Sequence, residues 1–526
     1  MSKRKRKVQG AARMPPTKNS GYSAGGGSTD RNVLKGWIPQ RLSAKSDIVP
    51  SLDILRGRSA DQSINTPIGA AAIKSSSLHA VGAGLKVFPR IRYKELGMTA
   101  EEARAWTRKT TREFDLWASS KEADITRRNN FYDMQDIAYT GYLTDGDSFV
   151  AFRRKPTTPN MPYTLRLQLL EANRISNPNT YGTSLYTVDM KAPDSDNRII
   201  DGVEIDNDGA VISFWVSNKV PWDILDAEKQ AEWTRVEAYG KNTMQPNILQ
   251  VCHDIRPEQY RGVPYLAPVL ETLKEVSRYT TAELTSAIIR SFFAIFFTES
   301  ADNKNLDDIL GSSFEDESNA PSVDVNEYAL TAGTLNALPK GVDVKSIGAN
   351  ANASTFDTFI SHLVKQIGAA IGQPYEVLMK NFTSSYSASR AALLQAWEEY
   401  KLRRIWFARD FCQPVYEKWL VEAIAIGRIE ASGFFDDPAI RAAWCGAEWF
   451  GPTMSILDPV KDVNGSALRT TYALSTRERE AAEMTGSDLE ENLEQLAYEK
   501  KLIDSLGLPT AQPAVLSGME GGDTDG

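Results

Sequence analysis

The sequence predicts an α+β protein of several connected regions, and two kinds of pattern lead to that prediction. Apolar side chains between Phe356 and Ile371 recur every three or four residues, so they share one face of a helix. Runs such as TLRLQLL and VISFWV lie between Asn-, Asp- and Gly-rich turns, as strands do. With 526 residues, the chain is long enough for about three average domains.

The first half of the chain predicts helices followed by strands. Thr99 and Glu102 form a capping box, so a helix should begin near residue 100, and a second helix is expected around residues 129–139. The turn signal TDGD then precedes the strand-like run SFVAFRR. Gly82 and Gly84 lack the third glycine of a dinucleotide-binding loop, so they indicate a tight turn or close packing.

Long helices are expected in the second half. Pro268 suits the first residue of a helix. The apolar face of that helix would comprise Val269, Leu273, Val276, Thr280, Leu284 and Ala287. Gly372 and Pro374 interrupt the helix described above, and the Ser-rich segment that follows should form a loop. A further helix pattern runs from Arg390, and Pro414 should kink it.

Charge is distributed unevenly along the chain. The net charge of −8 argues against a protein whose main task is to grip DNA phosphates tightly. Residues 299–327 hold nine acidic side chains and one lysine, which predicts either a solvated surface or a docking site for a partner. From Thr476 onward twelve acidic residues oppose four basic ones, so an acidic helical region is expected there. Its apolar face would comprise Leu489, Leu493, Leu496, Ile503 and Leu506.

The overall composition is that of a protein that folds in water. Hydrophobic residues make up 42% and charged residues 24% of the chain. The apolar stretch SFFAIFFT is far shorter than the ~20 residues that span a bilayer, so no membrane helix is expected. The N-terminus has five consecutive basic residues, from Lys3 to Lys7, and lacks the apolar core of a secretory signal. We expect a disordered arm in a cytoplasmic protein; contact with nucleic acid or a scaffold protein is the alternative.

The residue pattern does not predict an enzyme, a metal site or a cofactor. The phosphate-binding G-x-x-x-x-G-K-[ST] loop is absent, and the three histidines fit no metal spacing. Cys252 and His253 are adjacent, so on a strand they would point to opposite faces rather than form a catalytic pair. Asp145 and Asp147 lie in an ordinary turn without a third metal ligand nearby. The three cysteines, which are isolated, are expected to be buried thiols.

Four segments resemble one protein family. The string IGQPYEVLMKNFTSSYSASRAALLQAWEEYKLRR resembles the lambda-like portal family of tailed bacteriophages. The segments RGRSADQSINTPIGAAAIKSSSLHAVGAGLKV, RPEQYRGVPYLAPVL and ILDPVKD are similar to other parts of the same family. The resemblance extends from about Asp53 to Leu506, which is nearly the whole chain.

The resemblance implies the portal fold, with a wing, a helical stem, a clip, a tunnel loop before a long kinked helix, and a helical C-terminal crown. Together with the composition of the two ends, it divides the chain as follows: 1–52 a disordered basic arm, 53–255 the α+β wing, 256–297 the region of the first stem helix, 298–350 the clip, 351–380 the second stem helix, 381–389 the tunnel loop, 390–455 the long kinked helix and the return to the wing, 456–507 the helical crown, and 508–526 a disordered tail.

The resemblance also implies a function without catalysis. Identical subunits, usually twelve in the virion, would close a ring at one capsid vertex, through which double-stranded DNA is packaged, retained and ejected. The partners implied are the large terminase, which hydrolyses ATP, then a neck protein, and the major capsid and scaffold proteins. Assembly would occur in the host cytoplasm, and no membrane is involved. The alternatives are another head–tail connector or minor capsid protein and, less favoured, an enzyme that acts on DNA.

Three sets of site residues follow from the resemblance. The tunnel loop nearest DNA would contain Asn381, Phe382, Thr383, Ser384, Ser385, Tyr386 and Ser387. Possible phosphate contacts are Lys340, Lys345 and Lys380. Docking of partners at the clip would use Asp307, Asp308, Glu315, Asp316 and Glu317. The hydroxyl side chains of the loop would give weak phosphate contacts that do not depend on DNA sequence.

Overall fold

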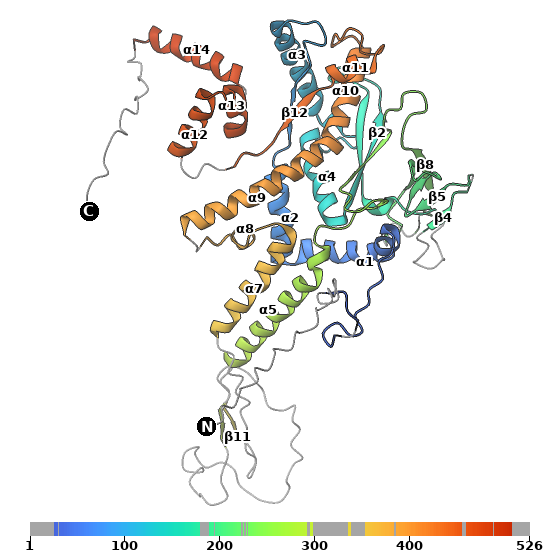
Figure 1. Ribbon diagram of the computed structural model, residues 1–526, viewed down its shortest axis with the longest axis vertical. Helices are drawn as coiled ribbons and strands as arrows, with labels where there is room; N and C mark the ends of the chain where they lie inside the picture. Colours follow the sequence, from blue (N-terminus) through green and yellow to red (C-terminus); the bar gives the residue numbers. More distant parts are fainter. Residues whose placement is uncertain are drawn as a thin grey trace, which may run out of the picture.

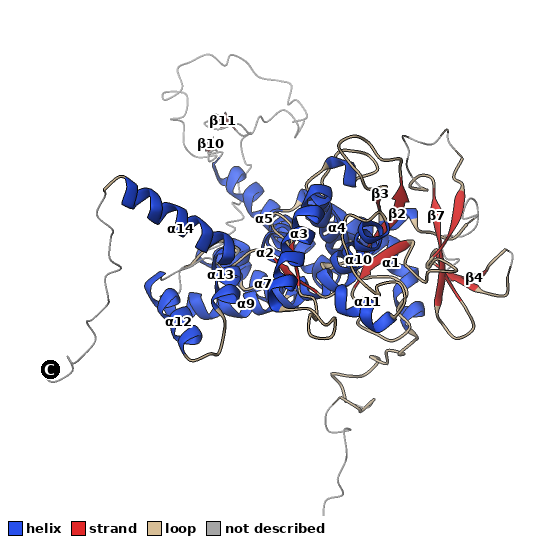
Figure 2. Ribbon diagram, turned by 90° about the horizontal axis from the view of Figure 1, so that it is seen from above, coloured by secondary structure: helices blue, strands red, loops and turns tan. Residues whose placement is uncertain are grey.

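A body of helices and sheets carries two extensions, a pair of long helices and a group of C-terminal helices (Figure 1). The computed structural model describes residues 26–29, 31–178, 189–193, 195–221, 223, 225, 228, 230–291, 295–297, 335–337, 353–382, 385–454, 459–487 and 489–507. Figure 2 shows that the strands β2, β3, β4 and β7 lie at the end of the body away from the C-terminal helices. The protein is therefore mixed α and β, as the sequence predicts.

The helices of the body enclose an aromatic core. They are α1 (Ala44–Asn65), α2 (Pro67–Ala80), α3 (Ala100–Ala118), α4 (Phe131–Asp145), α10 (Gln413–Ala425) and α11 (Pro438–Trp444). Phe114 lies at the centre, with its ring edge-on to Trp419 at 5.0 Å and to Tyr416 at 5.5 Å between ring centroids. All three side chains are fully buried. Such edge-to-face pairs add to the stabilisation that burial provides.

The N-terminal end of this core differs from the prediction. Helix α1 begins at Ala44, inside the segment 1–52 that the sequence predicts to be a disordered arm. Ala44 and Leu52 are buried, so packing of the helix against the body explains the earlier start. Residues 1–25 of the predicted arm lie outside the described part of the chain.

Two signals near the start of the body are confirmed. Thr99 and Glu102 form the predicted capping box at the start of α3, with reciprocal bonds between side chains and backbone. Gly82 and Gly84 both have a positive φ, of 58° and 100°. A Cβ on Gly84 would lie 2.6 Å from the Cβ of Tyr132, so this residue permits both the turn and close packing.

Two antiparallel sheets form the strand-rich end. One sheet has the order β3-β2-β9 and comprises β2 (Asp147–Arg154), β3 (Leu165–Leu170) and β9 (Ile248–Cys252). The other runs in sequence order through β4 (Asp189–Lys191), β5 (Arg198–Ile200), β6 (Val203–Ile205), β7 (Val211–Ser217) and β8 (Trp233–Glu237). A third pairing joins β1 (Lys86–Pro89) to β12 (Ala447–Phe450), so segments far apart in sequence meet beside α3.

The stem consists of α5 (Leu270–Ser291) and α7 (Ala353–Ile371), which run side by side away from the body (Figure 1). Pro268 lies in a short 3-10 turn directly before α5 rather than at its first residue. Tyr279 of α5 stacks on Phe356 of α7, with 5.4 Å between ring centroids. The short parallel strands β10 (Ile295–Phe297) and β11 (Leu335–Ala337) pair beyond α5.

The predicted apolar face of α5 is buried only near the body. Val269, Leu273 and Val276 are buried, whereas the side chain of Leu284 is 61% exposed. The predicted face is therefore confirmed only for its inner half, because Thr280, Leu284 and Ala287 of the outer half are exposed within one subunit. Phe359 on α7 is 48% exposed, although its ring packs edge-on against that of Tyr279, with 5.1 Å between ring centroids.

The segment after the stem contains the predicted break and kink. Helix α7 is followed by α8 (Tyr375–Met379), then by α9 (Tyr386–Phe407) and a π-helical segment, Ala408–Cys412, that leads into α10. Pro414 is the second residue of α10, and α9 and α10 run in different directions in Figure 1. A proline within a helix disrupts the regular turn that precedes it, and the π segment accommodates this change.

The C-terminal helices α12 (Pro459–Thr471), α13 (Arg477–Thr485) and α14 (Leu489–Ser505) lie beside the body (Figure 1). Helix α14 buries none of its residues, and Leu493 and Leu496 of its predicted apolar face are both more than half exposed. Among the described residues, no helix has the length and hydropathy needed to cross a bilayer.

Candidate functional site: the loop between α8 and α9 and its supports

The turn between α7 and α8 is anchored deep in the body. Gly372 takes a left-handed backbone conformation, with a φ of 71°, and ends α7. Gln373 follows and is almost fully buried. Its Nε2 donates to the carbonyl of Ala72 on α2 at 2.9 Å and to the hydroxyl of Tyr265 at 3.1 Å. The Tyr265 hydroxyl in turn donates to the carbonyl of Ile371. The residues that precede the candidate loop are therefore fixed to two other parts of the chain.

The loop itself is short and exposed. Lys380 ends α8 in a left-handed conformation, with a φ of 51°. Asn381 donates its backbone N–H to the carbonyl of Glu376 at 3.2 Å, and its side chain and that of Phe382 are exposed. Ser385 then caps α9, because its hydroxyl accepts the backbone N–H of Ala388 at 3.4 Å.

The loop is shorter than the predicted range 381–389. Tyr386 and Ser387 lie in the first turn of α9, so the predicted loop must end before them. The prediction treats the hydroxyl-rich sequence as a helix breaker, whereas Ser385 uses its hydroxyl as a helix cap. Thr383 and Ser384 lie outside the described residues.

The other predicted site residues are distributed as follows. Lys380 is exposed at the edge of the loop. Outside the described part of the chain lie Lys340, Lys345, Asp307, Asp308, Glu315, Asp316 and Glu317. The proposed phosphate contacts and the clip surface therefore remain predictions from the sequence, and at Lys380 the structure shows only that the residue is exposed.

Two arginines on α9 fix the helix that leaves the loop. The guanidinium of Arg403 lies over the ring of Tyr265, 4.6 Å from its centroid, and pairs with Glu399 at 2.8 Å. Arg404 donates to the carbonyls of His79 and Ala80 at 2.9 Å each and to that of Pro452 at 2.7 Å. Burial lowers the pKa of Arg404 to about 10, so the group remains a cation at neutral pH.

A buried ion cluster, which the sequence did not predict, joins α1, the start of β2 and the segment before α5. Asp147 is fully buried and accepts from Arg56 at 2.9 Å and from Arg261 at 2.7 Å. Arg261 also pairs with Asp201 at 2.5 Å. Burial alone would raise the pKa of Asp147, but the two guanidiniums outweigh it and lower the pKa. Asp147 thus pairs with two arginines, where the sequence analysis considered a metal. The cluster could not be predicted from local patterns because the arginines are 91 and 114 residues away from Asp147 in the sequence.

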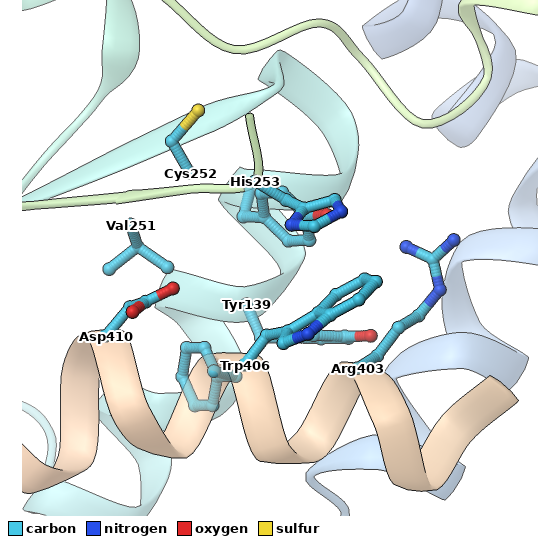
Figure 3. Close-up of a pocket in the computed structure, with 9 residues that line it drawn as sticks. Tyr139, Val251, Cys252, His253, Arg403, Trp406 and Asp410 are labelled. Carbon is cyan, nitrogen blue, oxygen red and sulfur yellow. The ribbon is translucent and has the colours of Figure 1, made fainter. Parts of the chain in front are cut away.

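A small pocket beside α9 is lined by Cys252 and His253, among other residues, but the two side chains are not placed as a catalytic pair. Figure 3 shows His253 flat against the indole of Trp406, and the rings lie 3.7 Å apart at 14°. The thiol of Cys252 donates to Asp254 at 3.4 Å, and burial raises its pKa well above the ordinary value. A protonated thiol is a poor nucleophile. Among the described residues, no group of three or more His, Cys, Asp or Glu side chains is placed to hold a metal ion.

The described residues thus form an α+β body, a pair of long helices, and a long kinked helix that follows the exposed residues Lys380, Asn381 and Phe382. A family model described as "Phage portal protein, lambda family" matches residues 30–404, so the chain belongs to this family. Portal protein B of Escherichia phage lambda is 26% identical over 506 residues, which cover 93% of this chain and 91% of the relative. The portal protein of Escherichia phage N15 is 25% identical, with the same coverage.

A more distant relative and a solved structure are also similar. A probable portal protein of Halomonas phage phiHAP-1 is 23% identical, and the match covers 87% of this chain and 82% of the relative. A chain from the virion of a native gene transfer agent particle is 12% identical, with a TM-score of 0.39, and the match covers 82% of this chain and 92% of that one. The portal family is structural rather than enzymatic.

Proposed function

We propose that copies of this chain, twelve in the virion, close a ring at one capsid vertex and surround double-stranded DNA. The observation that carries the proposal is the set of apolar side chains left exposed along the stem, α9 and the C-terminal helices. These include Leu284, Ile288, Phe359, Ile405, Val463, Leu468, Leu493 and Leu496. Exposed apolar surface on this scale marks a protein interface. Contacts between unlike faces of neighbouring copies generate closed rings.

The loop between α8 and α9 would face the DNA. Its described residues Lys380, Asn381 and Phe382 are exposed, while Gln373 and Arg404 hold the helices on either side. A channel must let DNA slide, so weak contacts that ignore base sequence suit the task. Hydroxyl side chains and one lysine offer such contacts, and Lys340 and Lys345 would add to them.

The ring would act as a passage and a docking platform, with the energy supplied elsewhere. The large terminase would hydrolyse ATP and drive DNA inward, and a neck protein would later replace it. Docking at the acidic residues between 299 and 327 would explain their charge. Scaffold and major capsid proteins would hold the ring at its vertex. A second candidate, another head–tail connector or minor capsid protein, would share the exposed surfaces but not the DNA-filled channel.

The first experiment is native mass spectrometry of the purified full-length protein, together with negative-stain microscopy. Twelve copies of the 58.2 kDa chain would give a ring of roughly 700 kDa with a central channel. A stable monomer or dimer under all assembly conditions would refute the ring.

The loop is tested separately, in rings shown to assemble. Residues 381–385 are replaced by a glycine-serine linker of the same length, and DNA packaging and retention are measured. The control replaces the exposed wing loop 241–244 in the same way. Loss of packaging or retention in the first variant alone supports a DNA-facing loop. Equal behaviour of the two variants contradicts it.

A further inference from the structure

Helix α3 presents three arginines on one exposed face. Arg104, Arg108 and Arg112 are spaced four residues apart, so they follow one another along the helix at steps of about 6 Å. The first two side chains are 70% and 57% exposed, and Arg112 is partly exposed as well. The opposite face of α3 packs Phe114 and Trp117 into the core, which fixes the direction of the arginines.

A fourth arginine extends this face. Thr107 of α3 donates its hydroxyl to the carbonyl of Pro89 at 3.4 Å, which places the end of β1 against the helix. Arg90 follows immediately and is partly exposed. We call Arg90, Arg104, Arg108 and Arg112 the arginine face. It is a basic surface on a chain whose net charge is −8.

Glutamates of the C-terminal helices cover much of the arginine face. Glu490 of α14 lies 3.3 Å from Arg108 and 3.8 Å from Arg104, and Glu494 lies 4.0 Å from Arg108. Glu478 of α13 lies 3.2 Å from Arg90, which also pairs with Glu448 of β12 at 3.2 Å. Because α14 buries none of its residues, these exposed ion pairs hold it against α3 without an apolar core. Exposed ion pairs are weak and exchange readily with another anion.

We propose that the arginine face binds the phosphate backbone of double-stranded DNA, and that Glu478, Glu490 and Glu494 occupy it until DNA displaces them. The proposal rests on the proposed function, in that DNA passes this protein, but it concerns a different surface. In Figure 1 α3 lies at the end of the body opposite the stem. DNA that had passed the ring would meet this end, and its binding would release α14 from α3.

Two features favour DNA over an acidic protein as the ligand. The guanidinium group binds two phosphate oxygens at once, and a row of arginines at regular steps suits a repeating phosphate chain. The arginine face also lacks an apolar centre of the kind that anchors a protein partner, since its exposed members are charged. The glutamates that now cover it supply carboxylates where phosphates would bind.

The test measures the binding of a short fluorescent duplex to assembled full-length rings by anisotropy, over a range of salt concentrations. The double variant Glu490→Gln/Glu494→Gln removes two competing carboxylates and should tighten binding about tenfold. The triple variant Arg104→Gln/Arg108→Gln/Arg112→Gln should weaken it. The slope of log affinity against log salt should become shallower by about 0.9 for each phosphate that the triple variant no longer binds.

Matched controls remove the same charge elsewhere. Glu499→Gln/Asp504→Asn changes two exposed acids further along α14, and Lys191→Gln/Arg198→Gln changes two exposed bases on the strand-rich end. Both should leave the affinity unchanged if the arginine face is the site. A third variant, Arg104→Lys/Arg108→Lys/Arg112→Lys, keeps the charge and should retain most of the salt slope. Ring formation by every variant shows that it has folded.

Two results would overturn the proposal. The first is an equal change of affinity in the glutamate variant and its control. The second is wild-type binding of the duplex by the arginine variant. The loop variant described above keeps the arginine face intact, so unchanged packaging and retention in that variant, together with the expected affinity changes in the α3 and α14 variants, would refute the DNA-facing loop alone.

Discussion

Arg261 and Asp147 form an ion pair of 2.7 Å between Nε and Oδ2, and both side chains are fully buried. Asp147 begins β2 of the wing, and Arg261 precedes the stem helix α5. The pair is supported by the backbone N–H of Gly262, which donates to Asp147 at 3.1 Å. The segment that leads into α5 is thus held to the start of β2 by charge and by a backbone hydrogen bond.

Replacement of Arg261 by Met should destabilise the protein severely. The change leaves Asp147 buried with a single guanidinium, that of Arg56, and breaking a buried pair costs about 3–5 kcal/mol. The measurement is urea unfolding followed by tryptophan fluorescence. Arg198→Met is the control, because it breaks an exposed pair with Asp189 and should cost about 0–1 kcal/mol. Similar losses in the two variants would show that the buried pair has no special role.

The sequence predicted the elements that local signals determine. The cap at Thr99 and the break after Gly372 each depend on neighbours within a few residues, and both are present. The ion cluster was not predictable, because its members are about a hundred residues apart and neither periodicity nor composition indicates pairing. The end of the loop was missed because a hydroxyl can either break or cap a helix, and its geometry decides which.

Asp145 should make stability depend on pH. Burial raises its pKa from 3.8 to about 6, since Arg56 only partly offsets the loss of solvent and Asp147 adds repulsion. As the pH falls through about 6, the folded state takes up a proton at Asp145 that the unfolded state does not yet bind. The free energy of unfolding therefore rises as the pH falls, until the unfolded state also becomes protonated near pH 3.8. Asp145→Asn replaces the carboxyl group by a neutral amide, so the free energy of unfolding should lose the pH dependence that Asp145 causes.

The measurement compares thermal unfolding of Asp145→Asn and the wild type across this pH range. The variant should be the more stable of the two above pH 6, and the difference should vanish towards pH 3.8. Glu204→Gln is the control, because it should change the free energy of unfolding in the opposite direction. Burial alone would raise the pKa of Glu204, but Arg235, Asn197 and Ser213 lower it to about 2, so this variant should be less stable than the wild type at neutral pH. A difference for Asp145→Asn that does not change with pH would contradict the assignment.

Arg404 should control the connection between α9, α2 and the segment that leads to the C-terminal helices. Its three hydrogen bonds end on His79, Ala80 and Pro452, which are the carboxyl end of α2 and a residue just after β12. Lysine keeps the charge but has no planar group that reaches three carbonyls together. Arg404→Lys should therefore leave buried acceptors unpaired and cost about 1–3 kcal/mol.

The effect of Arg404→Lys is best measured by hydrogen exchange in assembled rings. Exchange should accelerate at residues 79–84 and 451–454, because these backbone segments lose their shared donor. Arg409→Lys is the matched control, since this arginine follows α9 directly but is exposed and pairs with its neighbour Asp410. If both variants exchange as the wild type does, apolar packing alone holds the segment. If only Arg404→Lys accelerates exchange, one partly buried guanidinium couples the helix after the loop to the segment that leads to the C-terminal helices.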